Sequence, residues 1–140
     1  MTCTIYVMNA DGTAATPLTS LVWSSGDPEF SPDGSRIVFD SNKGGFVSAI
    51  WVMNANGSNN HRPHCPALEA FFPGWSPDGT QIVFADNCCL PYSNLYVMNA
   101  DGSGHRQLTH VLSSHKQRSA FAMRPLPSGA LDRPIFRWGA

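Results

Sequence analysis

A motif returns three times along this chain at a fixed step of 45 residues. The segment IYVMNADG at Ile5–Gly12 recurs as IWVMNANG at Ile50–Gly57 and as LYVMNADG at Leu95–Gly102. A second block keeps the same step, because FSPDGSRIVF at Phe30–Phe39 becomes WSPDGTQIVF at Trp75–Phe84. A period of ~40–45 residues is typical of an architecture built from one repeated supersecondary unit, most often a propeller blade.

Each unit has the pattern of four short β-strands. The runs IYVM, IWVM and LYVM, which begin at Ile5, Ile50 and Leu95, are apolar at every position rather than at alternate ones. This pattern is typical of strands covered on both faces. They are too short for helices, which need ~10 residues or more. In successive copies of the unit, we expect the first strand to end at Phe30 and at Trp75, and the second strand to cover 37–40 and 82–85. The third strand is expected at 50–54 and 95–99, and the last strand is expected to end near 18–19 in the first copy and near 108–109 in the third. Four antiparallel strands per period form a blade.

Two kinds of turn separate these strands. In the Ser-Pro-Asp-Gly tetrads, Pro presets φ, Asp suits the second turn position and Gly accepts the left-handed conformation. The Asn-Ala-Asp/Asn-Gly turns also use the positive φ that Gly allows. The identical placement of the repeated aspartates predicts a role in the turn rather than in a calcium set or a carboxylate pair. We assign structural turn roles to Pro32, Asp33, Gly34, Pro77, Asp78 and Gly79, and to Asp11, Gly12, Asn56, Gly57, Asp101 and Gly102.

The two blocks together resemble a known repeat. WSPDGxxIVF followed by IYVMNADGSxxxxLT resembles the TolB-type, WD-repeat-like β-propeller repeat, over roughly residues 4–110. The resemblance implies an all-β fold of four-stranded antiparallel blades, which in the family close into a propeller of about six or more blades. It also implies one of two roles. Some members of the family take part in periplasmic protein–protein interaction, and related propellers cover the active site of prolyl-oligopeptidase-type peptidases. Fold is implied more firmly than function.

The predicted organisation is a partial propeller: a half blade at 3–20, a blade at 24–65, a blade at 66–110 and a non-repeat tail at 111–140. The middle unit departs from the pattern at its end, where Pro63 predicts an edge or irregular strand. Repeat units depend on their neighbours for burial, and a closed propeller needs at least about four blades. We therefore expect either a fragment of a longer propeller or a chain that associates through exposed blade faces.

Charge divides the chain at the end of the repeat. Residues 1–110 hold four basic and nine acidic side chains, whereas residues 111–140 hold five basic side chains and one acidic. The tail carries Pro125, Pro127 and Pro134 among scattered arginines, and we expect it to be disordered and solvated. One alternative is a basic arm for an acidic partner or nucleic acid, a role that the sparse charge of the tail disfavours. The other is that the tail is not native coding sequence, as after a frameshift.

The sequence contains no membrane span and no secretory signal of the usual kind. No stretch of about 18 apolar residues occurs, and the segment MTCTIYVMNADG lacks a basic region followed by an apolar core. The compartment therefore stays unknown at this point. The family resemblance implies the periplasm or the extracellular space, while the missing signal indicates the cytoplasm or a truncated chain.

Cysteine and histidine offer weak candidates for a metal site. His61, His64, Cys65 and the pair Cys88–Cys89 include zinc-type ligands, but their spacing fits no known zinc pattern. A disulfide from Cys65 to Cys88 or Cys89 is an alternative, and free thiols, including that of Cys3, are favoured over both. His105, His110 and His115 recur every five residues, which matches neither strand nor helix faces, so we expect them to be exposed. We predict no metal and no cofactor.

The chain lacks the motifs of an enzyme. Gly74–Asp78 begins like a nucleophile elbow but lacks the closing Gly, and it leads into a hairpin rather than a helix. There is no Gly-rich phosphate loop. In a peptidase-type relative the catalytic residues would lie in a hydrolase domain that is absent from this sequence. We expect no catalytic residues and no enzymatic activity.

The sequence is therefore interpreted as a protein-interaction module. The alternative is a propeller cap fragment of a prolyl-oligopeptidase-type peptidase. The non-repeating segments 42–48, 67–72 and 87–94 are free to specialise, and we predict partner contacts at their apolar residues or self-association through blade faces. Packing beneath a long loop is an equal alternative for the same residues. These candidate contacts are Leu68, Phe71, Phe72, Leu90 and Tyr92.

Overall fold

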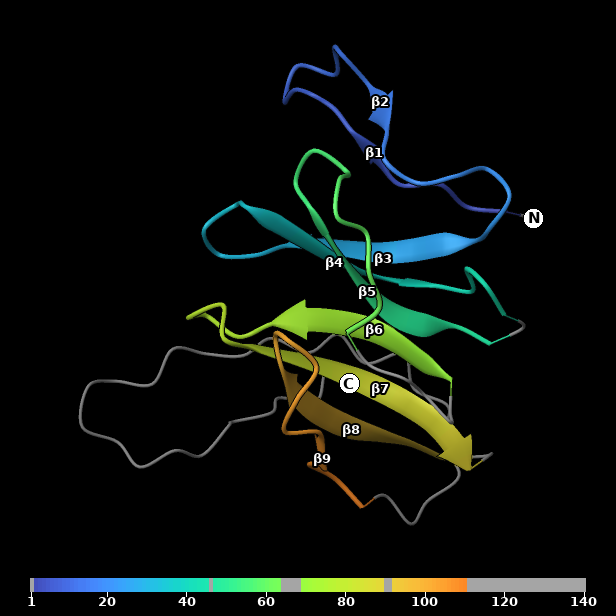
Figure 1. Ribbon diagram of the computed structural model, residues 1–140, viewed down its shortest axis with the longest axis vertical. Helices are drawn as coiled ribbons and strands as arrows, with labels where there is room; N and C mark the ends of the chain where they lie inside the picture. The colour runs from blue at the N-terminus through green and yellow to red at the C-terminus, as the bar shows by residue number, and fades with distance from the viewer. Residues whose placement is uncertain (1, 46, 64–68, 90–91, 111–140) are drawn as a thin grey trace.

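The computed structural model describes residues 2–45, 47–63, 69–89 and 92–110, apart from the side chains of residues 87–93. In this part of the chain all regular structure is β, in three antiparallel sheets that follow one another along the long axis (Figure 1). The first sheet contains β1 (Tyr6–Val7) and β2 (Thr16–Pro17). The second sheet contains β3 (Ser25–Phe30), β4 (Arg36–Ser41) and β5 (Ala49–Asn54). The third sheet contains β6 (Ala70–Trp75), β7 (Gln81–Cys89), β8 (Tyr92–Asn99) and β9 (Arg106–Gln107).

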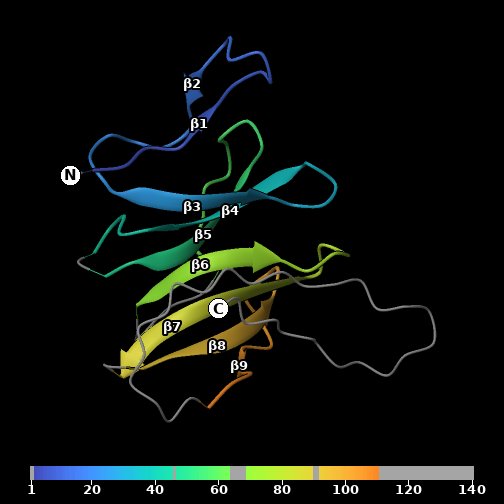
Figure 2. The same cartoon turned by 180° about the vertical axis from the view of Figure 1, so that it is seen from behind.

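The prediction of an all-β fold with four-stranded antiparallel blades is confirmed. The third sheet has the complete order β6-β7-β8-β9, and the second sheet repeats its first three strands as β3-β4-β5. Equivalent pairs keep the same register, since Ile37 lies opposite Met53 and Ile82 lies opposite Met98. The described sheets stand in an open row that does not close into a ring (Figures 1 and 2).

The last strand of the middle sheet is reduced to a single bridge. Val52 and His61 exchange both backbone hydrogen bonds, each at 2.9 Å. Pro63 follows two residues later and has no N–H to continue the ladder. The equivalent strands β2 and β9 are also short, and each lies at the outer edge of its sheet.

One predicted insertion is instead a continuation of a hairpin. We expected residues 87–94 to form a variable loop, but β7 extends to Cys89 and β8 begins at Tyr92. The pairing of Asp86 with Asn94 and of Cys89 with Tyr92 continues the ladder beyond the repeated core. The tail at 111–140, together with His64, Cys65 and Leu68, lies outside the described residues.

Two apolar clusters join the three sheets. Alternate residues of a strand point to opposite faces, so Ile37 and Phe39 of β4 turn toward the first sheet while Val38 turns toward the third. The first cluster contains Ile5, Ile37, Phe39 and Met53, with Leu18 and Trp51 at its margin. The second contains Val38, Ile50, Val52, Ala70, Trp75, Ile82, Phe84 and Met98. Fully burying one such side chain contributes about 1.5–3 kcal/mol, so these clusters hold the row together.

The strand β1 does not follow the expectation that its run is covered on both faces. Tyr6 is 54% exposed and Met8 is 64% exposed, although the equivalent Met53 and Met98 are fully buried. The cover of Met53 comes from β4 and from the first sheet. Beside β1, no described segment takes the place that β4 has beside β5, or the place that the first sheet has beside the second. This explains why Met8 is exposed although Met53 is buried.

In the part of the chain that the structure describes, there is no helix with the length and apolar character needed to cross a membrane.

Candidate interaction surfaces

The Ser-Pro-Asp-Gly turns are held by their aspartates. Asp33 Oδ1 accepts hydrogen bonds from Ser31 Oγ at 2.6 Å and from the Ser35 N–H at 3.1 Å. The bond from the Ser31 hydroxyl is the largest cause that lowers the pKa of Asp33 to about 2. Gly34 closes the turn with φ of 70°. The carboxylate is thus occupied with its own backbone and neighbouring hydroxyls.

The second tetrad has the same geometry 45 residues later. Asp78 Oδ1 accepts from Ser76 Oγ at 2.6 Å and from Thr80 at both its N–H and its hydroxyl, at 3.0 and 2.8 Å. The Ser76 hydroxyl is again the first cause of a lowered pKa for Asp78. Gly79 has φ of 69°. The turn, rather than a ligand, accounts for both aspartates.

The Asn-Ala-Asp/Asn-Gly turns show the same use of a side-chain oxygen. Asp11, Asn56 and Asp101 each accept from the N–H and the hydroxyl of the residue two positions later, at 2.8–3.0 Å and 2.6 Å. The glycines that follow, at 12, 57 and 102, have φ between 82° and 89°. Asn56 does what Asp11 and Asp101 do, so the turn needs an oxygen acceptor and not a negative charge.

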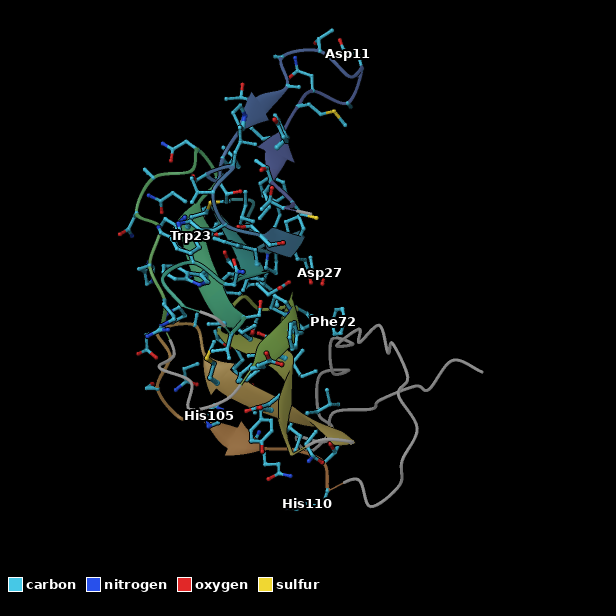
Figure 3. All side chains as sticks on the ribbon, turned by 90° about the vertical axis from the view of Figure 1, so that its right-hand side faces the viewer. Asp11, Trp23, Asp27, Phe72, His105 and His110 are labelled. Carbon is cyan, nitrogen blue, oxygen red and sulfur yellow. The ribbon has the colours of Figure 1, made fainter. Side chains whose placement is uncertain are left out.

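A bulge interrupts the first strand of both larger sheets at the same repeat position. The register shifts between Gly26 and Glu29 in β3 and between Phe71 and Gly74 in β6. Asp27 has φ of 45° and Phe72 has φ of 53°. These two equivalent residues project from one edge of the row, whereas His105 lies at the opposite edge (Figure 3). We call residues 26–29 and 71–74 the bulge edge.

Phe72 is the unusual member of the bulge edge. A bulky side chain at positive φ is uncommon because its Cβ crowds the backbone. Phe72 is nevertheless 39% exposed, and its ring lies 6.1 Å from that of the half-buried Phe71. The apolar ring is therefore presented to solvent by a backbone conformation that costs free energy.

A buried carboxyl group lies behind the bulge in the middle sheet. Asp40, on β4 opposite Gly26, is 9% exposed, and its Oδ2 accepts from Ser48 Oγ at 3.0 Å. Burial is the main cause that raises the pKa of Asp40 to about 6, and the carboxylate of Asp27 raises it further. The equivalent residue of the third sheet is the neutral Ala85. The charge of Asp40 is thus not a requirement of the repeat.

The third sheet carries an aromatic stack that the sequence pattern did not indicate. The His105 ring lies 5.1 Å from Tyr96 and 5.6 Å from Phe84, with interplanar angles of 11° and 27°. The prediction of an exposed His105 holds for its accessibility, but its ring packs on two aromatic rings. His110 is exposed, and His115 lies outside the described residues.

The structure describes only part of the predicted contact set. Phe71 and Phe72 lie in strand β6 rather than in a loop. Tyr92 belongs to β8, but its side chain lies outside the description, as do Leu68 and Leu90 altogether. Sequence reasoning missed Asp27 and Tyr6 as surface residues. The period of 45 aligns Asp27 with Phe72 and so could have pointed to Asp27, whereas the exposure of Tyr6 depends on the strands beside it.

Cysteine chemistry is described at one position. Cys3 has an exposed free thiol, while Cys65 lies outside the described residues and the side chains of Cys88 and Cys89 are not described. Over the described residues there is no group of three or more His, Cys, Asp or Glu side chains that could hold a metal ion.

The fold was compared with solved structures. The chain matches a structure assigned as TolB from Agrobacterium tumefaciens with a TM-score of 0.68 and 28% identity, covering 74% of this chain and 40% of that one. It matches TolB from Acinetobacter baumannii with a TM-score of 0.65 and 20% identity, covering 76% and 26%. An oligogalacturonate lyase in complex with manganese matches with a TM-score of 0.53 and 24% identity, covering 71% and 28%.

These comparisons separate fold from function. No family model matches the sequence, and no curated protein matches it. The chain spans less than half the length of the TolB structures, and the lyase shares the fold alone. The period, the sheet order and these likenesses agree: the described residues have the fold of TolB-like β-propeller repeats, and the chain spans part of the length of such a propeller.

Proposed function

We propose that this chain is a non-enzymatic protein-interaction module, part of a longer TolB-like propeller, whose contact surface is the bulge edge. The likeness to TolB supports a propeller fragment. The proposal places the module in the periplasm or outside the cell, following the family resemblance of its repeats. Its partner is a protein with an apolar contact group.

The observation that carries the proposal is the state of Phe72. Its positive φ and its exposure both cost free energy, because a left-handed backbone costs about 1–2 kcal/mol for a residue other than Gly, and the part of the side chain that stays exposed gains nothing from burial. Exposed aromatic residues of this kind are the usual anchors of protein interfaces. A partner that buries the ring of Phe72 would recover part of this cost.

The repeat shows that the fold does not need an aromatic residue at this place. Asp27 occupies the same bulge position in β3, with the same sign of φ, and the two strands otherwise have the same length and pairing. Bulge geometry is thus a property of the unit, whereas the Phe71–Phe72 pair belongs to the third sheet alone. A side chain that folding does not require is available for recognition.

The turn aspartates support the non-enzymatic part of the proposal. Asp33 and Asp78 hold equivalent turns, and each carboxylate accepts from serine or threonine groups next to it. Their pKa values are lowered, which makes them poor proton acceptors near neutral pH. A general acid or base would need the opposite shift, which Asp40 has, but the Asp40 side chain is only 9% exposed.

A capture experiment with matched variants tests this function. Phe72→Asp introduces the residue that β3 carries at the same position, and Asp tolerates positive φ better than Phe, so the variant is expected to fold. Leu21→Asp removes a different exposed apolar residue and serves as the control. Each protein is immobilised and exposed to extracts of the source cells, with folding checked by circular dichroism.

We expect a specific protein to be retained by the wild type and by Leu21→Asp but not by Phe72→Asp. Equal retention by all three proteins would contradict a contact at the bulge edge. Absence of any retained protein across repeated extracts would contradict the interaction function.

A further inference from the structure

The two bulges of the bulge edge share one geometry but differ in chemistry. Asp27 of β3 and Phe72 of β6 occupy the same repeat position, and both have positive φ. The residue on the strand beside each bulge differs in the same sense, since it is Asp40 on β4 and Ala85 on β7. One bulge is therefore acidic and the other is apolar.

The acidic bulge holds two carboxyl groups at different depths. Asp27 is exposed, whereas Asp40 is buried. Burial is the main cause that raises the pKa of Asp40, the Ser48 hydroxyl opposes it, and the Asp27 carboxylate raises it further through its charge. The two carboxyl groups therefore lie close enough for their negative charges to repel each other.

One oxygen of Asp40 has no hydrogen-bond donor in the part of the chain that the structure describes. Oδ2 accepts from Ser48 Oγ at 3.0 Å, while Oδ1 is buried and accepts no such bond there. Oδ1 lies next to Gly26 of the bulge, where a Cβ would be 3.5 Å from it. A buried carboxylate oxygen without a donor costs free energy, and a positive charge at the bulge would reduce that cost.

The acidic and the apolar bulge are neighbours along the row. Their strands β3 and β6 are in contact, and the Trp75 indole Nε1–H donates to the Glu29 carbonyl at 3.2 Å, which ties the two strands together. Asp27 and Phe72 project from the same edge (Figure 3). A single segment of a partner can therefore contact both side chains.

We propose that the bulge edge recognises a protein segment in which an arginine or lysine lies next to an apolar side chain. The cationic group pairs with the Asp27 carboxylate, behind which lies the charge of Asp40, and the apolar side chain covers the exposed ring of Phe72. This inference rests on the proposed interaction function and specifies the chemistry of the partner.

The charge of the repeats favours such a segment. Residues 1–110 hold nine acidic side chains and four basic ones, so a cationic segment is attracted from a distance. Charge complementarity orients the partner and speeds its association, while a buried aromatic ring is the usual anchor. The acidic bulge and the apolar bulge thus contribute differently to one contact.

The test uses the whole chain and two probes, N-acetyl-leucyl-arginine amide and N-acetyl-leucyl-citrulline amide. Citrulline has nearly the shape of arginine without its charge, so the two probes isolate the cationic group. On the protein, Asp27→Asn removes the exposed charge and keeps a residue that tolerates positive φ. Asp11→Asn is the matched control, because it removes the same charge from an exposed turn of the kind that Asn56 holds with an amide oxygen.

Binding is measured from the amide chemical shifts of isotope-labelled protein during titration. We expect the arginine probe to shift Asp27 and Phe72, to bind the wild type and Asp11→Asn alike, and to bind Asp27→Asn at least about threefold more weakly. The citrulline probe should bind the wild type as weakly as the arginine probe binds Asp27→Asn. Added salt should weaken the binding of the arginine probe and leave that of the citrulline probe nearly unchanged.

Four results would overturn the inference. They are no binding of the arginine probe to the wild type, equal affinity of that probe for the wild type and Asp27→Asn, equal affinity of the two probes for the wild type, and shifts confined to residues away from the bulge edge. Each result leaves the capture of a protein through Phe72 to be judged by its own experiment, so the two proposals fail separately. Circular dichroism verifies that each variant is folded.

Discussion

Arg36 and Trp75 connect the second and third sheets through one stacked contact. The Arg36 Cζ lies 4.6 Å from the centre of the indole ring, and Arg36 Nη2 donates to the Gly79 carbonyl at 3.3 Å. The indole Nε1–H in turn donates to the Glu29 carbonyl. A single side chain of β4 thus touches both the strand end and the turn of the following unit.

Replacing Arg36 with Gln introduces the residue that the third unit carries at the equivalent position, Gln81. We expect a loss of ~1–2 kcal/mol in the free energy of unfolding, because the cation–π contact and the bond to Gly79 disappear together. Arg36→Lys keeps the charge but loses the planar stacking group, so it should fall between the two. Urea unfolding measures this, and a Gln variant as stable as the wild type would contradict a linking role.

The repeated turn glycines offer a graded test of packing between units. A Cβ at Gly12 would meet no atom within 4 Å, a Cβ at Gly57 would lie 3.2 Å from Leu18 Cδ2, and a Cβ at Gly102 would overlap the carbonyl group of Pro63. All three residues have φ above 80°. The strain of positive φ is thus shared, and only the contact with the preceding unit differs.

We expect Gly12→Ala to cost ~1 kcal/mol through backbone strain alone. Gly102→Ala should cost ~1–3 kcal/mol more because backbone must move to make room, and Gly57→Ala should lie between because a leucine side chain can shift. Equilibrium unfolding of the three variants provides the ranking. Equal losses would show that the turns do not pack against the preceding unit as described.

The 45-residue period made the fold predictable to the level of individual pairs. It aligned Phe39 with Phe84 and Asp33 with Asp78, and these residues do occupy equivalent places. Turn chemistry is local, so four residues suffice to specify it. The exposure of Tyr6 depends instead on which strands lie beside it, and that information is not in the IYVM run itself.

The candidate surfaces were harder to read from the sequence. Phe71 and Phe72 were recognised as apolar residues available for contact, but a bulge with positive φ leaves no mark in an apolar run. The stack of His105 on Tyr96 forms across β8 and the turn that follows, so neither strand nor helix periodicity reveals it. The hairpin extension through Cys89 and Tyr92 was missed because Pro91 and the cysteines break the repeat.

The charge of the turn aspartates should matter in acid. The pKa of Asp78 is lowered by the Ser76 hydroxyl first and then by Thr80, so the folded state holds its proton less tightly than the unfolded chain. Its stabilising contribution is present above the ordinary value of 3.8 and is lost as pH falls below it. Asp78→Ala should lower the urea midpoint at neutral pH and reduce the loss of stability on acidification.

Asp78→Asn separates the two roles, since Asn56 shows that an amide oxygen can hold such a turn. This variant should keep most of the stability at neutral pH while losing the acid dependence. Unfolding curves at several pH values below 5 decide the matter. Asp78→Asn with the full acid dependence of the wild type would contradict the assignment.

Asp40 should have the opposite dependence on pH. Burial raises its pKa to about 6, with the Asp27 carboxylate raising it further and the Ser48 bond opposing both. Because the folded-state pKa lies above the ordinary value of 3.8, the contribution of Asp40 to stability is fully present below that value and is lost as pH rises through about 6.

Asp40→Ala introduces the residue found at the equivalent position of the third unit, Ala85. We expect this variant to be more stable than the wild type near about pH 7.5, and to lose that advantage as the pH falls toward about 4, where the wild-type carboxyl group is protonated. Asp27→Asn removes the neighbouring charge and should move the transition to lower pH. Urea unfolding across this range is the measurement, and a stability difference that stays constant with pH would refute the role of the buried carboxyl group.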